Sequence, residues 1–339
     1  MKRILYIDSL RGFGILLVVL GHILPNLFTD IEPYPNTNIW INSFHMPLFF
    51  VISGYFIYNQ KDYTINYTIT QIYKKTIQLL LPYLTMSLFY YMIYNGPRDP
   101  FNFLWYLYTL YEIYIIILFI QLINSMLHIK KSIILYIEFF FVYIILYNTV
   151  YIKFLYTYGD LLKMMPIIRY FPFIVLGITL KKYNIIAYFL RKKYVFTTLG
   201  VLSLLLFFDN CFCIIKYPTQ NYNDVFHPKV FEAVIEILFF WALFMKYSHS
   251  LKKLENYFIN IGTQTKEIYI IHYIFSILLG TPQIGFILIE ANKIIPYSSL
   301  IIQILISIPL AIIMIYLSLM VNKILSKNKI ISLISLGHY

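Results

Sequence analysis

The amino-acid sequence predicts an all-α fold, a polytopic membrane helix bundle of about ten transmembrane helices with both termini in the cytoplasm. Three observations support this prediction. Apolar runs of about 17 residues or more recur along the whole chain, and each is long enough to cross a hydrocarbon core about 30 Å thick. Charged residues make up only 12% of the chain, whereas soluble domains carry about 25%. The segments that connect these runs are alternately rich and poor in lysine and arginine.

The order of the apolar runs gives the spans and their orientation. The predicted spans cover residues 12–28, 39–60, 76–95, 103–123, 132–150, 166–180, 194–210, 229–246, 268–289 and 298–321. With the N-terminus inside, 20 of the 27 lysines and arginines fall on inner segments and 6 on outer segments, while Arg169 lies within a span. Because positive residues accumulate on cytoplasmic loops, this split predicts the orientation. The net charge of +12 therefore reflects membrane topology, and we expect no nucleic-acid partner.

The chain shows no internal repeat, low-complexity tract or linker, so residues 1–339 are predicted to form one membrane domain without an appended soluble domain. The longest inner connections are about 181–193 and 247–267. Cys211 and Cys213 match no recognised metal set and are interpreted as apolar packing, so no metal site is predicted. Abundant Ile, Tyr, Phe, Asn and Lys fit AT-rich codons, which indicates a bacterial origin and the bacterial cytoplasmic membrane as the location.

The first span carries the strongest functional pattern. Arg11 and His22 are eleven residues apart, so they lie on nearly one helix face, separated by roughly 16 Å along the axis. Asp8 precedes Arg11 by three residues, a spacing that lets the carboxylate hold the guanidinium. The pattern places an anion-binding cation at the cytoplasmic edge and an imidazole three turns deeper. The alternative is that Arg11 is a topological anchor and His22 a packing residue.

The second span places another imidazole at a similar depth. His45 lies about 9 Å below the outer surface if the span begins near Ile39. Pro47 releases a backbone carbonyl, which is tolerated where it lines a cavity. Two histidines at one level predict a polar pocket in the outer half of the bilayer. A pair of hydrogen-bonded structural histidines is the alternative.

Carboxylates inside other spans are also candidates, because ionisable groups in a bilayer are costly. Glu112 lies about 13 Å deep in the fourth span, with Trp105 one or two turns above it. Glu232 and Glu236 share one face of the eighth span near its outer end. These groups could orient a histidine or bind sugar hydroxyls, or they could be protonated and merely packed.

Six motifs occur in order through most of the chain and are Asp8-Ser9-Leu10-Arg11-Gly12, the Arg11-x10-His22 spacing, Phe44-His45-Met46-Pro47-Leu48-Phe49-Phe50-Val51-Ile52-Ser53-Gly54, Trp105-Tyr106-Leu107, Arg169-Tyr170-Phe171-Pro172-Phe173 through Gly177, and Gly262-Thr263 followed by Tyr269-Ile270-Ile271-His272. Together these motifs resemble the membrane-bound acyltransferase 3 family, in its short forms related to fucose 4-O-acetylases and polysaccharide O-acetyltransferases.

The resemblance implies an O-acyltransferase that moves an acyl group, expected to be acetyl, from cytoplasmic acyl-CoA to a hydroxyl of an extracytoplasmic or lipid-linked glycan. Acetyl-CoA, or another acyl-CoA, would be the donor substrate, and no bound cofactor is expected. By family analogy His22 is the catalytic histidine and Arg11 its partner in the motif. The expected site residues are His22 and His45 for catalysis, Arg11, Lys74 and Lys75 for acyl-CoA, Asp8 and Ser53 in support, and Trp105, Glu112 and Arg169 for the acceptor.

Two further expectations come from the family comparison. Long relatives carry an extracytoplasmic esterase-like domain, so a separate partner protein of that kind is expected here unless it is unnecessary. Many relatives have two arginines three residues apart before Pro82-Tyr83, where this chain has Lys75 and Gln78. One positive charge is therefore missing, and a lysine ammonium replaces a planar arginine guanidinium. The competing interpretation of the buried polar residues is a transporter or flippase for a lipid-linked saccharide.

Overall fold

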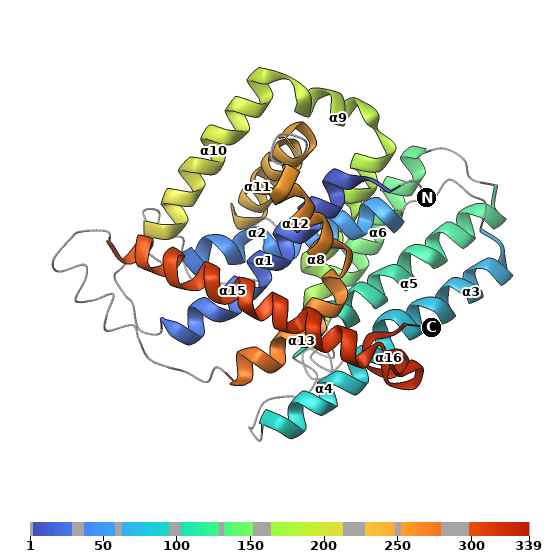
Figure 1. Ribbon diagram of the computed structural model, residues 1–339. Helices are drawn as coiled ribbons and strands as arrows, with labels where there is room; N and C mark the ends of the chain where they lie inside the picture. Colours follow the sequence, from blue (N-terminus) through green and yellow to red (C-terminus); the bar gives the residue numbers. More distant parts are fainter. Residues whose placement is uncertain are drawn as a thin grey trace. The chain divides into compact units, whose positions relative to one another are not determined.

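A computed structural model describes residues 3–28, 37–57, 63–94, 103–128, 132–151, 164–212, 228–247, 252–278 and 298–338. All secondary structure in this part of the chain is helical (Figure 1). The elements are α1 (Leu5–Leu27), α2 (Thr37–Ile57), α3 (Ile65–Lys75), the π-helical turn η1 (Thr76–Leu80), α4 (Leu81–Tyr94), α5 (Trp105–Met126), α6 (Ser132–Tyr151), α8 (Met164–Lys182), α9 (Asn184–Arg191), α10 (Lys193–Phe212), α11 (Pro228–Tyr247), α12 (Lys252–Thr263), α13 (Thr265–Leu278), α15 (Ser298–Leu325) and α16 (Lys329–Leu336).

The chain is a polytopic helical membrane protein, as predicted. Within the described ranges, six helices are long and apolar enough to cross a bilayer: Leu5–Leu27, Thr37–Ile57, Ile65–Ile93, Trp105–Met126, Lys193–Phe212 and Leu300–Leu325. Of the four other predicted spans, 132–150, 166–180 and 229–246 coincide with helices α6, α8 and α11. The fourth, 268–289, begins within α13, and its residues 279–289 lie outside the described residues. The count of ten spans and the cytoplasmic location of both termini stay predictions.

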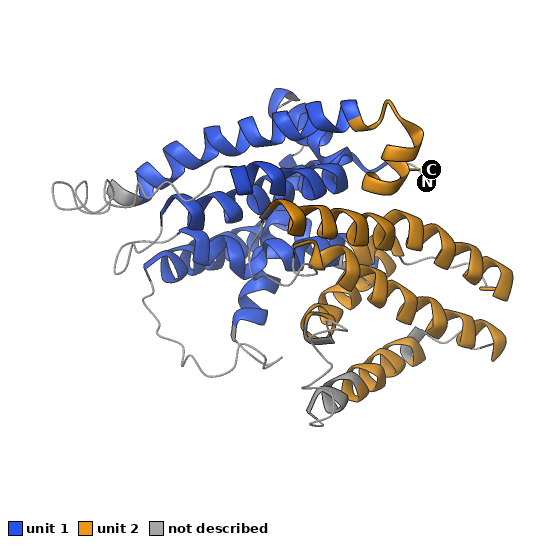
Figure 2. Cartoon of the chain, turned by 90° about the horizontal axis from the view of Figure 1, so that it is seen from below, with its two compact units in different colours: residues 1–52, 183–324 blue, residues 53–182, 325–339 orange. Residues whose placement is uncertain are grey.

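The chain divides into two compact units (Figure 2). The first comprises residues 1–52 and 183–324, and the second comprises residues 53–182 and 325–339. The chain therefore leaves the first unit near the end of α2, returns to it after α8, and enters the second unit again after α15.

In the first unit, α1 packs against α12, α13 and α11. Small residues on α1 permit these contacts, because a glycine lets another backbone approach closely. Aromatic rings fill the space on the α11 side, where Phe240 lies 4.6 Å from Phe13 of α1 and stacks at 5.3 Å on Phe44 of α2, measured between ring centroids. Most of α1 is thereby buried.

In the second unit, α5 packs against α3, η1 and α8, and α6 packs against α8. Gly54, at the end of α2, lies so close to α8 that a Cβ atom there would stand 2.1 Å from the backbone oxygen of Ile174. The π-helical turn ends just before Pro82, which has no N–H to donate to the helix. Such a missing donor is a common cause of a local break in the α-helical ladder.

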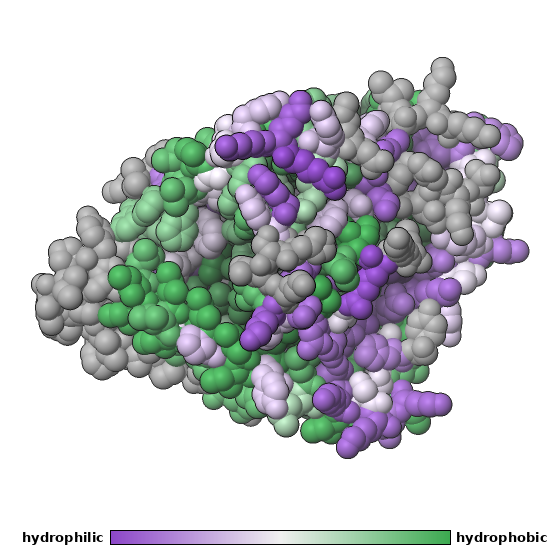
Figure 3. All heavy atoms as spheres, turned by 45° about the horizontal axis from the view of Figure 1, so that its top comes forward, coloured by the Kyte–Doolittle hydropathy of each residue, from purple (hydrophilic) through white to green (hydrophobic). Residues whose placement is uncertain are grey.

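Large apolar side chains are exposed on several helices, and apolar residues form part of the surface seen in Figure 3. On α15, Ile301 and Leu305 are 61% and 66% exposed, and on α10 Leu205 is 60% exposed. A soluble monomer seldom leaves such patches in contact with water. A surrounding bilayer covers them in a membrane protein.

The inner connection predicted at 247–267 contains a helix, α12, that packs along α1. Charged and polar residues reduce the hydropathy of this segment, so its sequence predicted only a connection between spans. Cys211 is buried, as expected for apolar packing, while Cys213 lies outside the described residues.

Candidate functional site

His22 projects from α1 toward two aromatic side chains of α13. Its ring centroid lies 5.2 Å from that of His272 and 5.0 Å from that of Tyr273. One helical turn further along both helices, the Asn26 side-chain amide donates a hydrogen bond to the Ser276 hydroxyl at 3.0 Å. His22 is partly exposed, whereas His272 is fully buried. The interface between helices α1 and α13 is therefore partly polar, and it contains the predicted catalytic histidine.

His45 lies on α2 in the same unit as His22, near enough for the two rings to interact electrostatically if both are charged. Its Nδ1 atom is 2.8 Å from the backbone oxygen of Ile41. Because a carbonyl can only accept, Nδ1 must carry the proton in this contact. In the neutral ring Nε2 is then the acceptor. His22 and His45 therefore belong to the same unit, and the polar pocket predicted between them stays a prediction.

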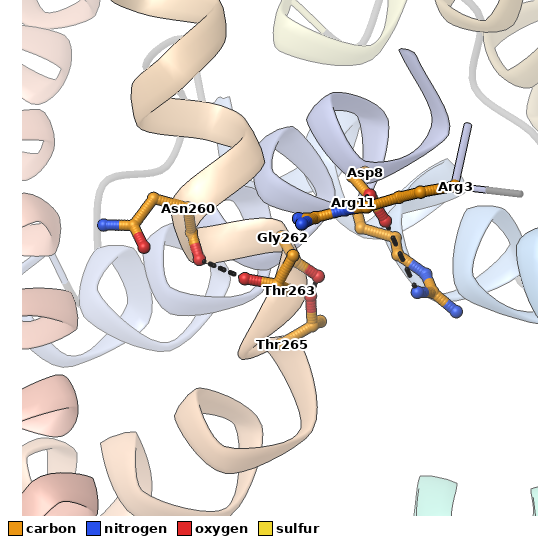
Figure 4. Close-up of polar contacts among 7 residues, drawn as sticks. All are labelled: Arg3, Asp8, Arg11, Asn260, Gly262, Thr263 and Thr265. Carbon is orange, nitrogen blue, oxygen red and sulfur yellow. Dashed lines mark hydrogen bonds and ion pairs between the residues drawn. The ribbon is translucent and has the colours of Figure 1, made fainter. Parts of the chain in front are cut away.

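At the other end of α1, a buried carboxylate holds two arginines (Figure 4). Asp8 is 6% exposed and accepts a hydrogen bond from Arg3 Nε at 2.6 Å. The Arg11 guanidinium lies 3.8 Å from the second Asp8 oxygen, with about a third of its side chain exposed (34%). The predicted three-residue pairing is confirmed. Arg11 is thus held beside a carboxylate while it keeps access to the surface.

The turn between α12 and α13 lies against this end of α1 (Figure 4). A Cβ atom on Gly262 would stand 1.9 Å from the backbone oxygen of Asp8. Thr263 donates its hydroxyl to the Asn260 carbonyl at 2.8 Å, and Thr265 donates to the Gly262 carbonyl at 2.6 Å. The turn is therefore well defined and fixes the start of α13, the helix that carries His272.

Lys266 follows this turn and lies just before the predicted span 268–289. Burial lowers the pKa of Lys266, and the neighbouring Glu267 carboxylate opposes that shift. Neither residue was singled out from the sequence. The sequence feature that could have drawn attention to this turn is the Gly262-Thr263 pair, since it belongs to the segments on which the family resemblance rests.

The two carboxylates of α11 are buried in a hydrogen-bonded network in the first unit. Glu236 accepts from Trp40 Nε1 at 2.9 Å with one oxygen and from the Ser203 hydroxyl at 2.6 Å with the other. Glu232 accepts from the Asn210 amide at 3.1 Å. Glu236 therefore ties α2 and α10 to α11, which favours a structural role for it over a role at the histidines.

Six of the predicted site residues belong to the second unit. Trp105 stacks on Tyr170 with ring centroids 5.3 Å apart. Glu112 is hydrogen-bonded to Tyr108. The Ser53 and Tyr106 hydroxyls lie 3.1 Å apart. The remaining three are Lys75, whose Nζ lies 5.0 Å from the centre of the Tyr114 ring, Lys74 in the last turn of α3, and Arg169, which is exposed.

The predicted site residues thus fall into two sets. The first unit holds Asp8, Arg11, His22 and His45, together with His272, for which no role was predicted from the sequence. The second unit holds Ser53, Lys74, Lys75, Trp105, Glu112 and Arg169. Among the described residues, no three His, Cys, Asp or Glu side chains are grouped to hold a metal ion.

The acyltransferase domain family known as acyltransferase 3 matches residues 4–322, which is nearly the whole chain. No curated protein and no solved structure gives a significant match. The family match covers the helices that carry Arg11, His22, His45 and His272, and it confirms the family inferred from the motifs. With its membrane-spanning helices, the chain belongs to the acyltransferase 3 family and is a membrane acyltransferase.

Proposed function

We propose that this protein is an O-acyltransferase of the bacterial cytoplasmic membrane. It takes an acyl group, in the simplest case acetyl, from cytoplasmic acyl-CoA and transfers it to a hydroxyl of an extracytoplasmic or lipid-linked glycan. The family match supports acyl transfer in a membrane. The donor, the acceptor and the residue roles are part of the proposal.

The observation that carries the proposal is the placement of Arg11 and His22 on one helix, α1. Eleven residues separate them, or roughly 16 Å along the axis. Arg11 is a partly exposed cation beside Asp8, which suits a phosphate of CoA because a guanidinium binds phosphate with two N–H groups. His22 is a partly exposed imidazole further along α1. A ligand with an anionic head and a reactive far end matches this arrangement.

His22 can act in either of two ways. As a general base it removes the proton from the acceptor hydroxyl, whose oxygen attacks the thioester carbon while the carbon–sulfur bond breaks, and the CoA thiolate receives the proton. As a nucleophile it first displaces the CoA thiolate to form an acyl-imidazole, which the acceptor hydroxyl then attacks. Both routes yield the same ester and free CoA.

Other residues are assigned supporting roles in this scheme. Asp8 holds Arg11, and His45 polarises or positions the reacting groups with Ser53 in support. The cytoplasmic lysines are proposed to bind CoA phosphates, and the aromatic and polar side chains of α5 and α8 to bind the acceptor; these residues are Lys74, Lys75, Trp105, Glu112 and Arg169. A separate extracytoplasmic esterase-like protein is a proposed partner for completing the transfer.

The proposal is tested by surface polysaccharide NMR on cells that lack the gene and are complemented with variants. His22→Ala should abolish O-acetylation while the protein still inserts in the membrane. His128→Asn is the matched control, because His128 is an exposed histidine in a left-handed backbone conformation (φ 53°) that asparagine tolerates. Wild-type acetylation in His22→Ala would remove the catalytic assignment.

The same strains separate acyl transfer from saccharide transport. A flippase would leave ester signals unchanged on whatever polysaccharide reaches the surface, and would change the amount of that polysaccharide instead. Loss of ester signals at a constant amount of polysaccharide supports the acyltransferase.

A further inference from the structure

We propose that His272 is the positioning residue for His22, holding its ring and accepting a hydrogen bond from it when His22 takes a proton. This inference rests on the proposed function for its role in catalysis. Its structural part, the interaction between the two rings, can be tested without acyl transfer.

The tautomer of His272 follows from its contacts. The side chain is fully buried, at 0% exposure, and its Nδ1 lies 3.0 Å from the backbone oxygen of Ile268 one turn earlier in α13. Because this carbonyl can only accept, Nδ1 carries the proton and Nε2 of the neutral ring carries a lone pair. The bond to the backbone also fixes the orientation of the ring.

The lone pair on Nε2 has no hydrogen-bond partner among the residues that the structure describes. Leaving a buried acceptor unsatisfied is destabilising. Such a group in a native fold requires an explanation, and a catalytic role is one of those found. His22 is the imidazole packed against this ring, with centroids 5.2 Å apart and an interplanar angle of 43°.

The protonated state of His22 supplies that donor. A neutral His22 that removes a proton becomes an imidazolium, and a hydrogen-bond acceptor beside the ring favours such a cation. An imidazolium donates from both nitrogens, so one N–H can turn to the Nε2 lone pair of His272 while the other faces the reacting groups. Which nitrogen of a histidine carries a proton is set by the partner of the other nitrogen.

Packing alone does not explain a histidine at this position. The Tyr273 ring also contacts His22, edge-on at 5.0 Å, so α13 can cover His22 with an ordinary aromatic residue. Among the described residues, the titratable groups next to the pair are Tyr269 and Tyr273 on α13 and His45 on α2. A phenol is neutral near pH 7, so neither tyrosine places a charge beside His22 in that range.

Three substitutions separate the two ring nitrogens of His272. His272→Gln places an amide oxygen near the Nε2 position and keeps an acceptor there. His272→Asn keeps a polar group near the Nδ1 position, next to the Ile268 carbonyl, and loses the Nε2 acceptor. His272→Phe keeps a ring and loses both. If His272 only fills space, Phe should be the best tolerated and Gln should have no advantage over Asn.

The first measurement is chemical modification of His22 by diethylpyrocarbonate, which reacts with the neutral imidazole, followed by peptide mass spectrometry as a function of pH. Removing an acceptor that stabilises the protonated ring should move the midpoint for His22 by about 0.5–1 pH unit to lower pH in the Phe and Asn variants. His272→Gln should return it toward the wild type, and the midpoint for His128 should stay constant. An unchanged His22 midpoint in properly folded Phe and Asn variants overturns the proposal.

The second measurement is acyl transfer in membranes. The Phe and Asn variants should lose kcat by about tenfold to hundredfold, with the KM for acyl-CoA unchanged. This range is taken from metal-bound histidines that lose the partner orienting their ring. His272→Gln should recover most of this loss. If the wild type transfers no acyl group but the His22 midpoint still moves, the proposed function fails and the link between the two histidines stands.

Discussion

Alanine at Gly12 should force α1 and α12 apart. A Cβ atom at this position would stand 2.0 Å from the backbone oxygen of Phe258 and 2.7 Å from its carbonyl carbon. Ordinary contact begins at 3.4 Å, so the two backbones would have to separate by roughly 1 Å or more. Overpacking costs about 1–3 kcal/mol when side chains can adjust. Here the obstacle is backbone, so we expect the upper end of that range or more.

The same helix provides the matched control. Gly21→Ala adds a Cβ atom whose nearest neighbour is the Asn42 side-chain oxygen at 3.5 Å, which is ordinary contact. Gly262→Ala should resemble Gly12→Ala, because its Cβ atom would stand 1.9 Å from the Asp8 carbonyl oxygen. The two interface variants test the same close approach from opposite helices.

The assay is thermal unfolding of the purified protein in detergent, together with acyl transfer. A destabilisation of about 3 kcal/mol corresponds to a fall in Tm of roughly 4 °C for a chain of this size. Gly12→Ala and Gly262→Ala should show this fall and lose activity, because the displaced segment includes Asp8 and Arg11. The packing argument is wrong if Gly12→Ala melts within about 1 °C of the wild type, or if Gly21→Ala is destabilised equally.

Two further predictions concern charged groups near this interface. Arg11→Ala should raise the KM for acyl-CoA by about tenfold or more, because a charged hydrogen bond to phosphate contributes about 1.5–3 kcal/mol. A high concentration of acyl-CoA should restore turnover. A loss of kcat that no donor concentration restores would contradict a binding role. In the folded protein, burial lowers the pKa of Lys266 below its ordinary value of 10.5. Folding is therefore penalised while the lysine is charged, and the free energy of unfolding rises with pH as the folded state releases the proton. Lys266→Met should therefore be more stable than the wild type near pH 7, with the difference in Tm shrinking toward pH 10; a difference that is constant with pH would refute this account.

Hydropathy alone predicted most of the helices. The second predicted span, 39–60, corresponds to Thr37–Ile57, and the last, 298–321, to Ser298–Leu325. The third began too late, since the helix continues back to Ile65 through an amphipathic segment. Hydropathy cannot detect such a segment, because one polar face reduces the average. The helix α12 was missed for the same reason.

The site was predictable only within single helices. The Asp8–Arg11 pair and the shared face of Arg11 and His22 follow from helical periodicity, which is local. The contact between His22 and His272 joins residues 250 positions apart, and no spacing rule specifies which helices meet. Likewise, the four-residue spacing of Glu232 and Glu236 predicted a shared face, but Trp40 and Ser203 as partners of Glu236 come from other helices.

In the proposed function, Arg11 near one membrane surface and His22 deeper in the same helix connect cytoplasmic acyl-CoA to an extracytoplasmic glycan. Sealed membrane vesicles of known orientation, supplied with acyl-CoA that carries a radioactive acetyl group, test it most directly. In inverted vesicles, where the cytoplasmic face is outside, externally added donor should label glycan in the lumen in the wild type but not in His22→Ala. Labelling that needs donor on the extracytoplasmic face, or that persists in His22→Ala, would contradict the account.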